Sequence, residues 1–361
     1  MTKFDKIICL IAAIIWVVVI GLAIYLKQIS TFEKRELITP IILNFVGTNL
    51  DEGQREFILK ANPFGVILIS ENIQSYQQTK KLIGDLKALF PDRTLYLTID
   101  QEGGRVDRLR KISEGQKVLK KASYYGDLAL KDLDKAKKEL YGDAKNTAKI
   151  LKDLGFDINF APMVDLTFIK KRQDFDPEIS WAATQERSYG GDVAIVVELA
   201  RQFIMGMDSE GVITSVKHIP GLGRAYDDSH DNQAVIDAKI DDLEEQDFEV
   251  FKQLLPLMKV AMSSHGTYLS VDDEPATFSK KVIQGIIRDE IGFKGLLISD
   301  ALNMVAVLDV GMDQRVQKAL DAGIDVVMPH YLSKVTAIEA IKAISDDELV
   351  EFNDRLVELG F

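Results

Sequence analysis

The sequence is poor in several residue types on which other protein classes depend. It has one cysteine in 361 residues, so the chain cannot form an internal disulfide. Its four histidines show no spacing typical of a metal site, and we expect neither a metal ion nor another cofactor. Basic residues number 44 against 56 acidic ones, for a formal net charge of −12. Because nucleic-acid binding needs an excess of Lys and Arg at the contact surface, we expect no nucleic-acid partner.

One long hydrophobic run is present near the amino terminus. Residues 7–26 carry no charge, and a helix of this length spans the ~30 Å hydrocarbon core of a bilayer. A cleaved signal peptide is the alternative, but its apolar core is normally shorter, about 7–15 residues. We therefore predict a transmembrane anchor over residues 1–26, a charged tether over 27–36 and one folded domain over 37–361. The basic residues on either side of the run do not determine its orientation.

Eight apolar runs alternate with amphipathic helical stretches in the remainder of the chain. Eight such strands favour a (β/α)8 barrel, because this number of parallel strands closes the sheet into a ring. An open, doubly wound parallel sheet is the alternative fold. The predicted strands are 41–46, 65–70, 95–99, 157–161, 213–217, 260–264, 295–299 and 324–328. The predicted helices include 143–154, 193–210, 243–254, 279–290, 334–344 and 347–359.

Ionisable side chains follow five of these runs near the point where the strand ends. Asp100, Asp165, His218, His265 and Asp300 come after the third to the seventh strand in turn. In a (β/α)8 barrel the active site forms at the carboxyl ends of the strands. The sequence therefore predicts that these groups converge on one rim of the barrel.

The segment after the fifth strand carries the most distinctive motif. Residues 217–230 read KHIPGLGRAYDDSH. This motif resembles that of the bacterial β-N-acetylglucosaminidases of glycoside hydrolase family 3, in the branch that uses histidine as catalytic acid/base. Four further segments match the family in the correct order, namely TIDQEGGRVDRL, NFAPMVDL, ERSYGGD and LLISDALNM. The resemblance covers nearly the whole predicted barrel and implies the same fold.

The resemblance implies a catalytic set of three residues. Asp300, in a Ser-Asp-x-Leu-x-Met pattern, matches the nucleophile that attacks the anomeric carbon. His230 matches the acid/base, a role that suits an imidazole because it gives and takes a proton near neutral pH. Asp228 would hold the other ring nitrogen of His230 and favour its protonated form. Taken alone, an Asp after a strand is also typical of a helix cap, and an Asp-x-His pair of a surface turn.

The resemblance also implies a set of substrate-binding residues. Asp100, Arg108, Arg187, Lys217 and His218 match positions that contact the terminal sugar, and the guanidinium groups suit its hydroxyl and carbonyl oxygens. The ammonium group of Lys217 is expected near the nucleophile, where it would favour the ionised carboxylate. A contact from Asp100 to the non-reducing sugar would make the site a closed pocket and the enzyme exo-acting.

Other residues of the matching motifs are expected in supporting positions. His265 is grouped with the substrate-binding residues but is expected behind the pocket rather than against the sugar. A buried hydrogen-bonding or ion-pairing role is predicted for Asp165. Trp181 is expected to pack in the fold rather than stack on a sugar ring. Glu102 and Arg105 are predicted to form a structural ion pair at the barrel rim.

Together these matches predict a retaining exo-β-N-acetylglucosaminidase that releases terminal GlcNAc from peptidoglycan-type fragments. Many family members have a second domain that supplies a glutamate acid. Only about thirty residues follow Pro329 in this sequence, so we expect the acid to come from the barrel itself.

Alternative functions remain open from the sequence. The chain would also suit a β-glycosidase of different sugar preference, a phosphorylase, or a catalytically silent, membrane-bound glycan-binding protein. Because cell-wall glycan lies outside the cell, we expect the anchor to hold the barrel on the outer side of the cell membrane. The sequence does not indicate an oligomeric state.

Overall fold

The computed structural model describes residues 14–16, 19, 35–113, 115, 118–170, 178–229, 232–330 and 334–361. Within these residues eight parallel strands form a closed barrel, in which β1 pairs with both β2 and β14. An open sheet leaves its outer strands unpaired on one side, so the doubly wound alternative is excluded and the predicted (β/α)8 barrel is confirmed. Around the ring the strands are β1 (Thr39–Leu43), β14 (Val326–Met328), β13 (Leu296–Ala301), β11 (Val260–Ser263), β9 (Ile213–Ile219), β6 (Ile158–Asn159), β3 (Tyr96–Ile99) and β2 (Pro63–Leu68).

Each predicted strand overlaps one of these barrel strands. The strands are nearly continuous apolar runs because a parallel sheet is covered on both faces, here by the outer helices and by the barrel interior. The first strand begins at Thr39, two residues before its predicted start. The fourth is limited to Ile158–Asn159, because the chain then turns and the Ala161 N–H donates to the Asn159 carbonyl (2.8 Å).

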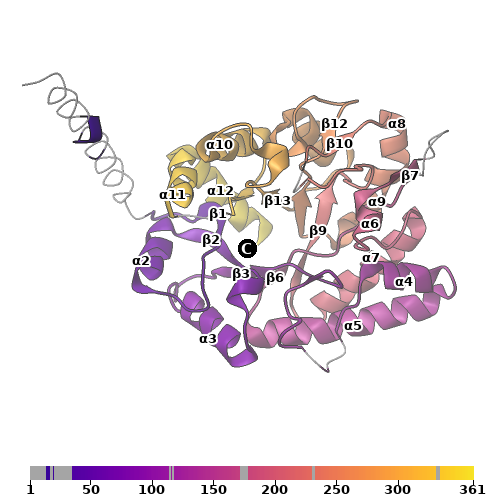
Figure 1. Ribbon diagram of the computed structural model, residues 1–361, viewed down its shortest axis with the longest axis horizontal. Helices are drawn as coiled ribbons and strands as arrows, with labels where there is room; N and C mark the ends of the chain where they lie inside the picture. Colours follow the sequence, from indigo (N-terminus) through magenta and orange to yellow (C-terminus); the bar gives the residue numbers. More distant parts are fainter. Residues whose placement is uncertain are drawn as a thin grey trace, which may run out of the picture.

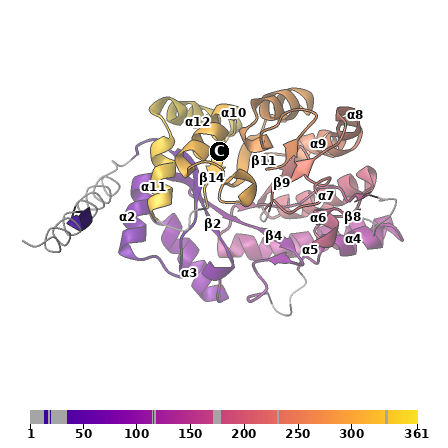
Figure 2. The ribbon, with the colours of Figure 1, turned by 45° about the horizontal axis from the view of Figure 1, so that its top comes forward.

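Helices surround the ring of strands in both views (Figures 1 and 2). The main difference from the sequence prediction is α5, which begins at Leu133 rather than at residue 143. Asp132 caps its amino terminus by accepting a hydrogen bond from the Lys135 N–H, and the buried Ala136 and Leu140 extend the apolar face of the later turns toward this cap. The helices are α2 (Glu52–Ala61), α3 (Tyr76–Lys87), α4 (Ala122–Ala129), α5 (Leu133–Leu154), α6 (Trp181–Thr184), α7 (Val193–Asp208), α8 (Ile240–Asp242), α9 (Phe248–Leu254), α10 (Met312–Ala322), α11 (Lys334–Ala343) and α12 (Asp346–Leu359).

Shorter elements decorate the loops between strands and helices. Two segments are π-helical, η2 (Leu243–Asp247) and η5 (Lys281–Glu290). Four are 3-10 helices, η1 (Ser70–Asn72), η3 (Leu255–Leu257), η4 (Ala276–Phe278) and η6 (Val305–Val307). Three small strand pairs are β4 (Gln101–Gly103) with β5 (Val106–Asp107), β7 (Ile169–Lys170) with β8 (Glu178–Ile179), and β10 (Val235–Ile236) with β12 (Thr267–Tyr268).

The carboxyl-terminal helix closes the barrel at the amino ends of its strands. Phe352 and Leu356 of α12 join the apolar cluster that fills the barrel interior. Phe64 stacks on Tyr96, with 4.6 Å between ring centroids, and both rings contact Phe361. The carboxyl terminus accordingly lies at the centre of the ring in Figure 1. Apolar side chains thus fill the barrel interior at the amino ends of the strands.

The predicted membrane anchor lies almost entirely outside the described residues. Of the run 7–26, only Ile14, Ile15, Trp16 and Val19 are described, and the tether contributes residues 35 and 36. Among the helices of the described part, none has the length and apolar character needed to cross a membrane. The anchor stays a prediction from the sequence.

Candidate active site

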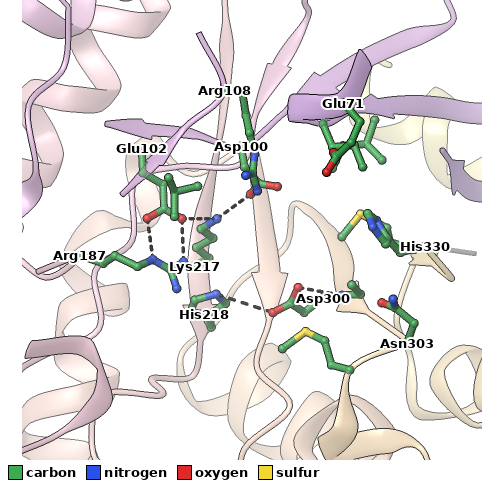
Figure 3. Close-up of a pocket in the computed structure, with 16 residues that line it drawn as sticks. Glu71, Asp100, Glu102, Arg108, Arg187, Lys217, His218, Asp300, Asn303 and His330 are labelled. Carbon is green, nitrogen blue, oxygen red and sulfur yellow. Dashed lines mark hydrogen bonds and ion pairs between the residues drawn. The ribbon is translucent and has the colours of Figure 1, made fainter. Parts of the chain in front are cut away.

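A pocket of about 440 Å³ lies at the carboxyl ends of the barrel strands. Asp100 reaches it from the end of β3, Lys217 and His218 from β9, and Asp300 from β13 (Figure 3). Of the five groups predicted to converge on one rim, Asp100, His218 and Asp300 line this pocket, whereas Asp165 and His265 do not. The pocket is lined by Ile67, Ile69, Glu71, Asp100, Glu102, Val106, Arg108, Arg187, Lys217, His218, Asp300, Ala301, Asn303, Met304, Met328 and His330.

One wall of this pocket is a buried cluster of two acids and two bases. Lys217 Nζ lies 2.8 Å from Asp100 Oδ1 and 2.7 Å from Glu102 Oε1. Arg187 donates two parallel hydrogen bonds to Glu102, from Nε to Oε2 at 2.8 Å and from Nη2 to Oε1 at 2.7 Å. Figure 3 shows Glu102 between the two cations. Bidentate pairing fixes the orientation of both planar groups, so this wall is preorganised.

The charges within the cluster stabilise one another. Burial alone would raise the pKa of Glu102, but the charges of Arg187 and Lys217 and their hydrogen bonds outweigh it, and its pKa falls well below the ordinary value. Burial alone would lower the pKa of Lys217, but Asp100 and Glu102 outweigh it and raise that pKa above the ordinary value. The pKa of Arg187 is likewise raised by Glu102 against its burial. All three groups are therefore ionised at neutral pH.

His218 is held between two carboxylates. Its Nδ1 lies 2.6 Å from Asp165 Oδ2, and its Nε2 lies 3.7 Å from Asp300 Oδ2. Asp165 is fully buried, which confirms the supporting hydrogen-bonding role predicted for it. By holding Nδ1, Asp165 fixes the ring so that Nε2 faces the pocket and Asp300.

An irregularity in β9 brings two adjacent side chains to the same pocket. In a regular strand, neighbouring side chains point to opposite faces. The pairing of β9 with β11 shifts register here, since Met262 is opposite Lys217 while Ser263 is opposite Ile219. The peptide bond between Lys217 and His218 is cis at this irregularity, and both side chains line the pocket.

Asp300 lines the same pocket as Lys217. Its side chain is 14% exposed, and its Oδ1 accepts a hydrogen bond from the Ala301 N–H (2.7 Å). The ammonium group of Lys217, which the sequence placed near this carboxylate, is held by Asp100 and Glu102. The side chain of His218 approaches Asp300.

Most of the chain is similar to a known protein family and to named bacterial enzymes. The sequence profile described as "Glycosyl hydrolase family 3 N terminal domain" matches residues 29–353. The chain belongs to glycosyl hydrolase family 3. The "Beta-hexosaminidase" of Stenotrophomonas maltophilia is 31% identical over 311 residues, which cover 86% of this chain and 88% of the relative. That of Nitrosomonas eutropha is 31% identical over 291 residues, 80% of each chain.

Solved structures of the family have the same architecture. NagZ from Neisseria gonorrhoeae, in complex with N-trifluoroacetyl-D-glucosamine, superimposes with a TM-score of 0.76 at 26% identity, over 90% of this chain and 91% of that one. A family 3 β-N-acetylglucosaminidase from Paenibacillus gives a TM-score of 0.75 at 26% identity, over 89% of this chain and 60% of that one. The chain is therefore a family 3 glycoside hydrolase.

The remaining predicted residues of the family 3 site are placed as follows. Arg108 lines the pocket, with Nη1 3.5 Å from Ser70 Oγ, and its Nε is buried without a hydrogen-bond partner among the described residues. Asp228 is described and half-buried, whereas His230 lies outside the described residues. The Ala306 N–H of η6 donates to the Ser229 carbonyl (3.3 Å). The loop that leads to His230 therefore reaches the segment that follows Asp300.

The structure corrects one expectation about supporting residues and confirms two. His265 lies behind the pocket, as expected, and does not line it; its Nδ1 bonds to Thr277 Oγ1 (2.7 Å) and its Nε2 to the Ala301 carbonyl (3.1 Å). Glu102 pairs with Arg187 and Lys217 rather than with Arg105, which is exposed. Trp181 is buried and donates its indole N–H to the Leu222 carbonyl (3.1 Å), a packing role as predicted.

Sequence reasoning missed the wall of the pocket opposite the charged cluster. Glu71, Asn303 and His330 form that side in Figure 3. Burial lowers the pKa of His330, while the nearby carboxylates of Asp100 and Asp300 act in the opposite direction. Its backbone has a φ of 43°, an unusual value for a non-glycine residue. The available signal was its position, two residues after β14, where barrel strands place active-site groups.

Proposed function

We propose that this family 3 chain is a retaining exo-β-N-acetylglucosaminidase that releases terminal GlcNAc from peptidoglycan-type fragments. The observation that carries the proposal is the position of Asp300, whose carboxylate lines a pocket together with Asp100, Arg108, Lys217 and His218. A carboxylate beside a set of hydroxyl-binding groups is the arrangement that glycoside hydrolysis requires.

The proposed reaction has two steps. First, a carboxylate oxygen of Asp300 bonds to the anomeric carbon as the glycosidic C–O bond breaks, and His230 donates a proton to the departing oxygen. Water then gives a proton to His230, its oxygen bonds to the anomeric carbon, and the bond to Asp300 breaks. Each displacement inverts the anomeric carbon, so the product keeps the β configuration. Asp228 would orient His230 and favour its protonated form before the first step, when it acts as the acid.

Substrate preference is proposed from the pocket and the relatives. A pocket of about 440 Å³, above a barrel interior filled by the apolar cluster, suits one terminal sugar with part of the next and favours exo action. The two relatives named β-hexosaminidase and the NagZ complex with an N-acylated glucosamine favour GlcNAc over glucose. The choice of peptidoglycan-type fragments rests on the family resemblance and on the proposed location.

For that location, we propose a single membrane anchor over residues 1–26 with the barrel on the outer side of the cell membrane. The uncharged run 7–26 supports the anchor, and its described members, Ile14, Ile15, Trp16 and Val19, are all more than half exposed. The chain enters the barrel at the end closed by α12, where the Ile38 N–H bonds to Asn353 (3.2 Å). The pocket opens at the opposite end, so a tethered barrel would direct it away from the membrane. Protease treatment of intact cells should digest the barrel; protection until lysis would place it inside.

The enzymatic proposal is tested with the full-length chain purified in mild detergent. We expect turnover of 4-nitrophenyl β-N-acetylglucosaminide, with kcat/KM lowered roughly 10⁴-fold or more in Asp300→Asn. His230→Ala should lower kcat rather than kcat/KM, by between about 10² and 10⁴-fold, because 4-nitrophenolate leaves without a proton and the loss falls on the attack of water. Because azide attacks without base assistance, added azide should restore turnover of the glycosyl intermediate in His230→Ala.

Other results would reject specific parts of the proposal. NMR of the first product formed should show β-GlcNAc, and an initial α anomer would rule out retention. Turnover of the matching glucoside alone would reject the sugar assignment. A phosphate-dependent product, GlcNAc 1-phosphate, would indicate a phosphorylase. Saturable GlcNAc binding without turnover of either substrate would indicate a glycan-binding protein.

A further inference from the structure

The loop between β9 and β10 is firmly attached at its beginning. Asp165 Oδ1 accepts a hydrogen bond from the Leu222 N–H (2.6 Å), and the Trp181 indole donates to the carbonyl of the same residue (3.1 Å). The Tyr268 hydroxyl donates to the Gly221 carbonyl (2.7 Å). These contacts come from three separate segments of the chain, so the start of the loop is fixed from several sides.

Arg224 continues this attachment with a charged side chain. Its Nε lies 2.6 Å from Asp247 Oδ2, and its Nη2 donates to the Asp242 carbonyl and to Gln246 Oε1, both at 3.0 Å. Its guanidinium carbon lies 4.2 Å from the centroid of the Phe168 ring. Arg224 therefore ties the loop to α8 and the π-helical segment η2 at once. Such π-helical segments occur frequently at functional sites.

The Asp247 side chain packs against Gly221, at the start of the same loop. Its side chain is 1% exposed, and a Cβ added to Gly221 would lie 2.9 Å from Asp247 Cβ. Its second oxygen, Oδ1, is buried with no hydrogen-bond partner among the described residues. The Asp247 carboxylate thus depends on Arg224 for its charge pairing.

The chain after Arg224 is attached once more before it becomes less buried. Ala225 is fully buried, and its carbonyl accepts the Trp181 N–H (3.2 Å). Tyr226 and Asp228 are half-buried and Asp227 is exposed, and the Ala306 N–H donates to the Ser229 carbonyl. Arg224 is four residues before Asp228 and six before the predicted acid/base His230 in sequence, so the contacts of Arg224 help to set the path on which the chain approaches the catalytic pair.

We propose that Arg224 and Asp247 are positioning residues, whose buried ion pair sets the start of the loop so that Asp228 and His230 meet the departing oxygen of the substrate. This inference rests on the proposed function, because it assigns the pair to proton transfer. Misplacement of a catalytic group by about 1 Å is sufficient to lower a rate by roughly 10²-fold.

Dependence on the leaving group tests this role. Protonation of the departing oxygen matters greatly for a sugar alkoxide and little for 4-nitrophenolate, which leaves readily without a proton. In full-length Arg224→Gln/Asp247→Asn, we expect kcat/KM for N,N′-diacetylchitobiose to fall roughly 10- to 100-fold, and that for the 4-nitrophenyl substrate less than about 3-fold. The double variant removes both charges, so no buried charge is left without its partner. Arg224→Lys keeps the positive charge but loses the planar guanidinium group. Its kcat/KM for the disaccharide should lie between those of the double variant and the parent.

A matched control is provided by a second buried Arg–Asp pair far from the loop. Arg288 Nη2 lies 2.7 Å from Asp325 Oδ2, with side chains 11% and 14% exposed, and Asp325 also accepts the Leu297 N–H near the amino end of β13. Arg288→Gln/Asp325→Asn should lower the stability of the barrel while leaving the ratio of the two kcat/KM values unchanged.

The outcomes separate this inference from the proposed function. An active parent whose ratio of kcat/KM values is unchanged in both Arg224→Gln/Asp247→Asn and Arg224→Lys would overturn the inference and leave the proposed function standing. An equal change of ratio in the Arg288→Gln/Asp325→Asn control would also overturn it, since the effect would then be one of stability. A parent inert on both substrates would overturn the proposed function and this inference together.

Discussion

Two buried arginine–carboxylate pairs in this barrel shift the pKa of their carboxylates in opposite directions. In the pocket wall, Arg187 and Lys217 together keep the pKa of Glu102 well below its ordinary value. Beneath the β9–β10 loop, burial raises the pKa of Asp247 to about 6, although Arg224 acts in the opposite direction. Both carboxylates are withdrawn from water, so burial alone does not explain the difference.

The number of donors around each carboxylate explains it. Both oxygens of Glu102 accept hydrogen bonds, from Arg187 and from Lys217, whereas Asp247 uses one oxygen on Arg224 and its other oxygen has no partner among the described residues. The Asp165 carboxylate further disfavours a negative charge on Asp247. A buried acid with two cations is locked in the ionised form, while one with a single cation remains close to titration.

The largest effect is expected when Glu102 is neutralised and its ion pairs with Arg187 and Lys217 are lost. Glu102→Gln leaves Arg187 and Lys217 buried without their shared counter-charge, and one Asp100 carboxylate has to serve both. We expect the free energy of unfolding to fall by about 3–5 kcal/mol. Because Lys217 and Arg187 line the pocket, kcat/KM should also fall, by roughly 100-fold. Urea unfolding and steady-state kinetics measure the two losses; stability within 1 kcal/mol of the parent by urea titration would refute the account given for this cluster.

A smaller effect is expected at Asp165, whose carboxylate contacts both the pocket and the start of the β9–β10 loop. Asp165 holds the His218 ring through Oδ2 and the Leu222 N–H through Oδ1. Asp165→Asn keeps the shape but allows the imidazole to take the wrong tautomer, so Nε2 no longer presents a fixed group to Asp300. We expect kcat/KM to fall roughly 10- to 100-fold on both the disaccharide and the 4-nitrophenyl substrate. A loss confined to the disaccharide would instead assign Asp165 to the loop.

The sequence predicted the barrel well because its signals are local. Each strand is an apolar run long enough to recognise, and the strand ends placed Asp100, His218 and Asp300 on one rim, where all three line the pocket. The start of α5 was missed because charged residues dominate its first turns, although Ala136 and Leu140 continue the apolar face of the helix there. The ends of strands therefore predict which residues lie together, whereas the start of a helix depends on a single capping hydrogen bond that the sequence pattern does not reveal.

The pairings within the site could not be predicted in the same way. Lys217 was expected near Asp300, and the sequence did not predict that Asp100 and Glu102 hold its ammonium group. The partner of Arg187 is 85 residues earlier in the chain, and that of Arg224 is 23 residues later. No spacing rule connects such residues, because their contact depends on how the loops fold above the barrel.

The smallest effect, and the one that best separates the two pairs, concerns pH. Since the pKa of Asp247 is about 6 in the fold and 3.8 ordinarily, the folded state holds this proton more tightly, and stability is lost as pH rises from about 4 to about 6. The charged groups that act on Asp247 are Arg224 from the loop and Asp165 from the segment after β6. Asp247→Asn removes this titration, so the parent should lose about 1–3 kcal/mol relative to the variant between pH 4 and pH 7.

Glu102→Gln should behave oppositely: the pKa of Glu102 is lowered in the fold, so the parent's advantage over that variant is full above about pH 4.5 and shrinks only at lower pH. Urea unfolding at pH 4, 5, 6 and 7 compares both variants with the parent, and a pH-independent difference for Asp247→Asn would mean that its carboxylate is as firmly ionised as that of Glu102.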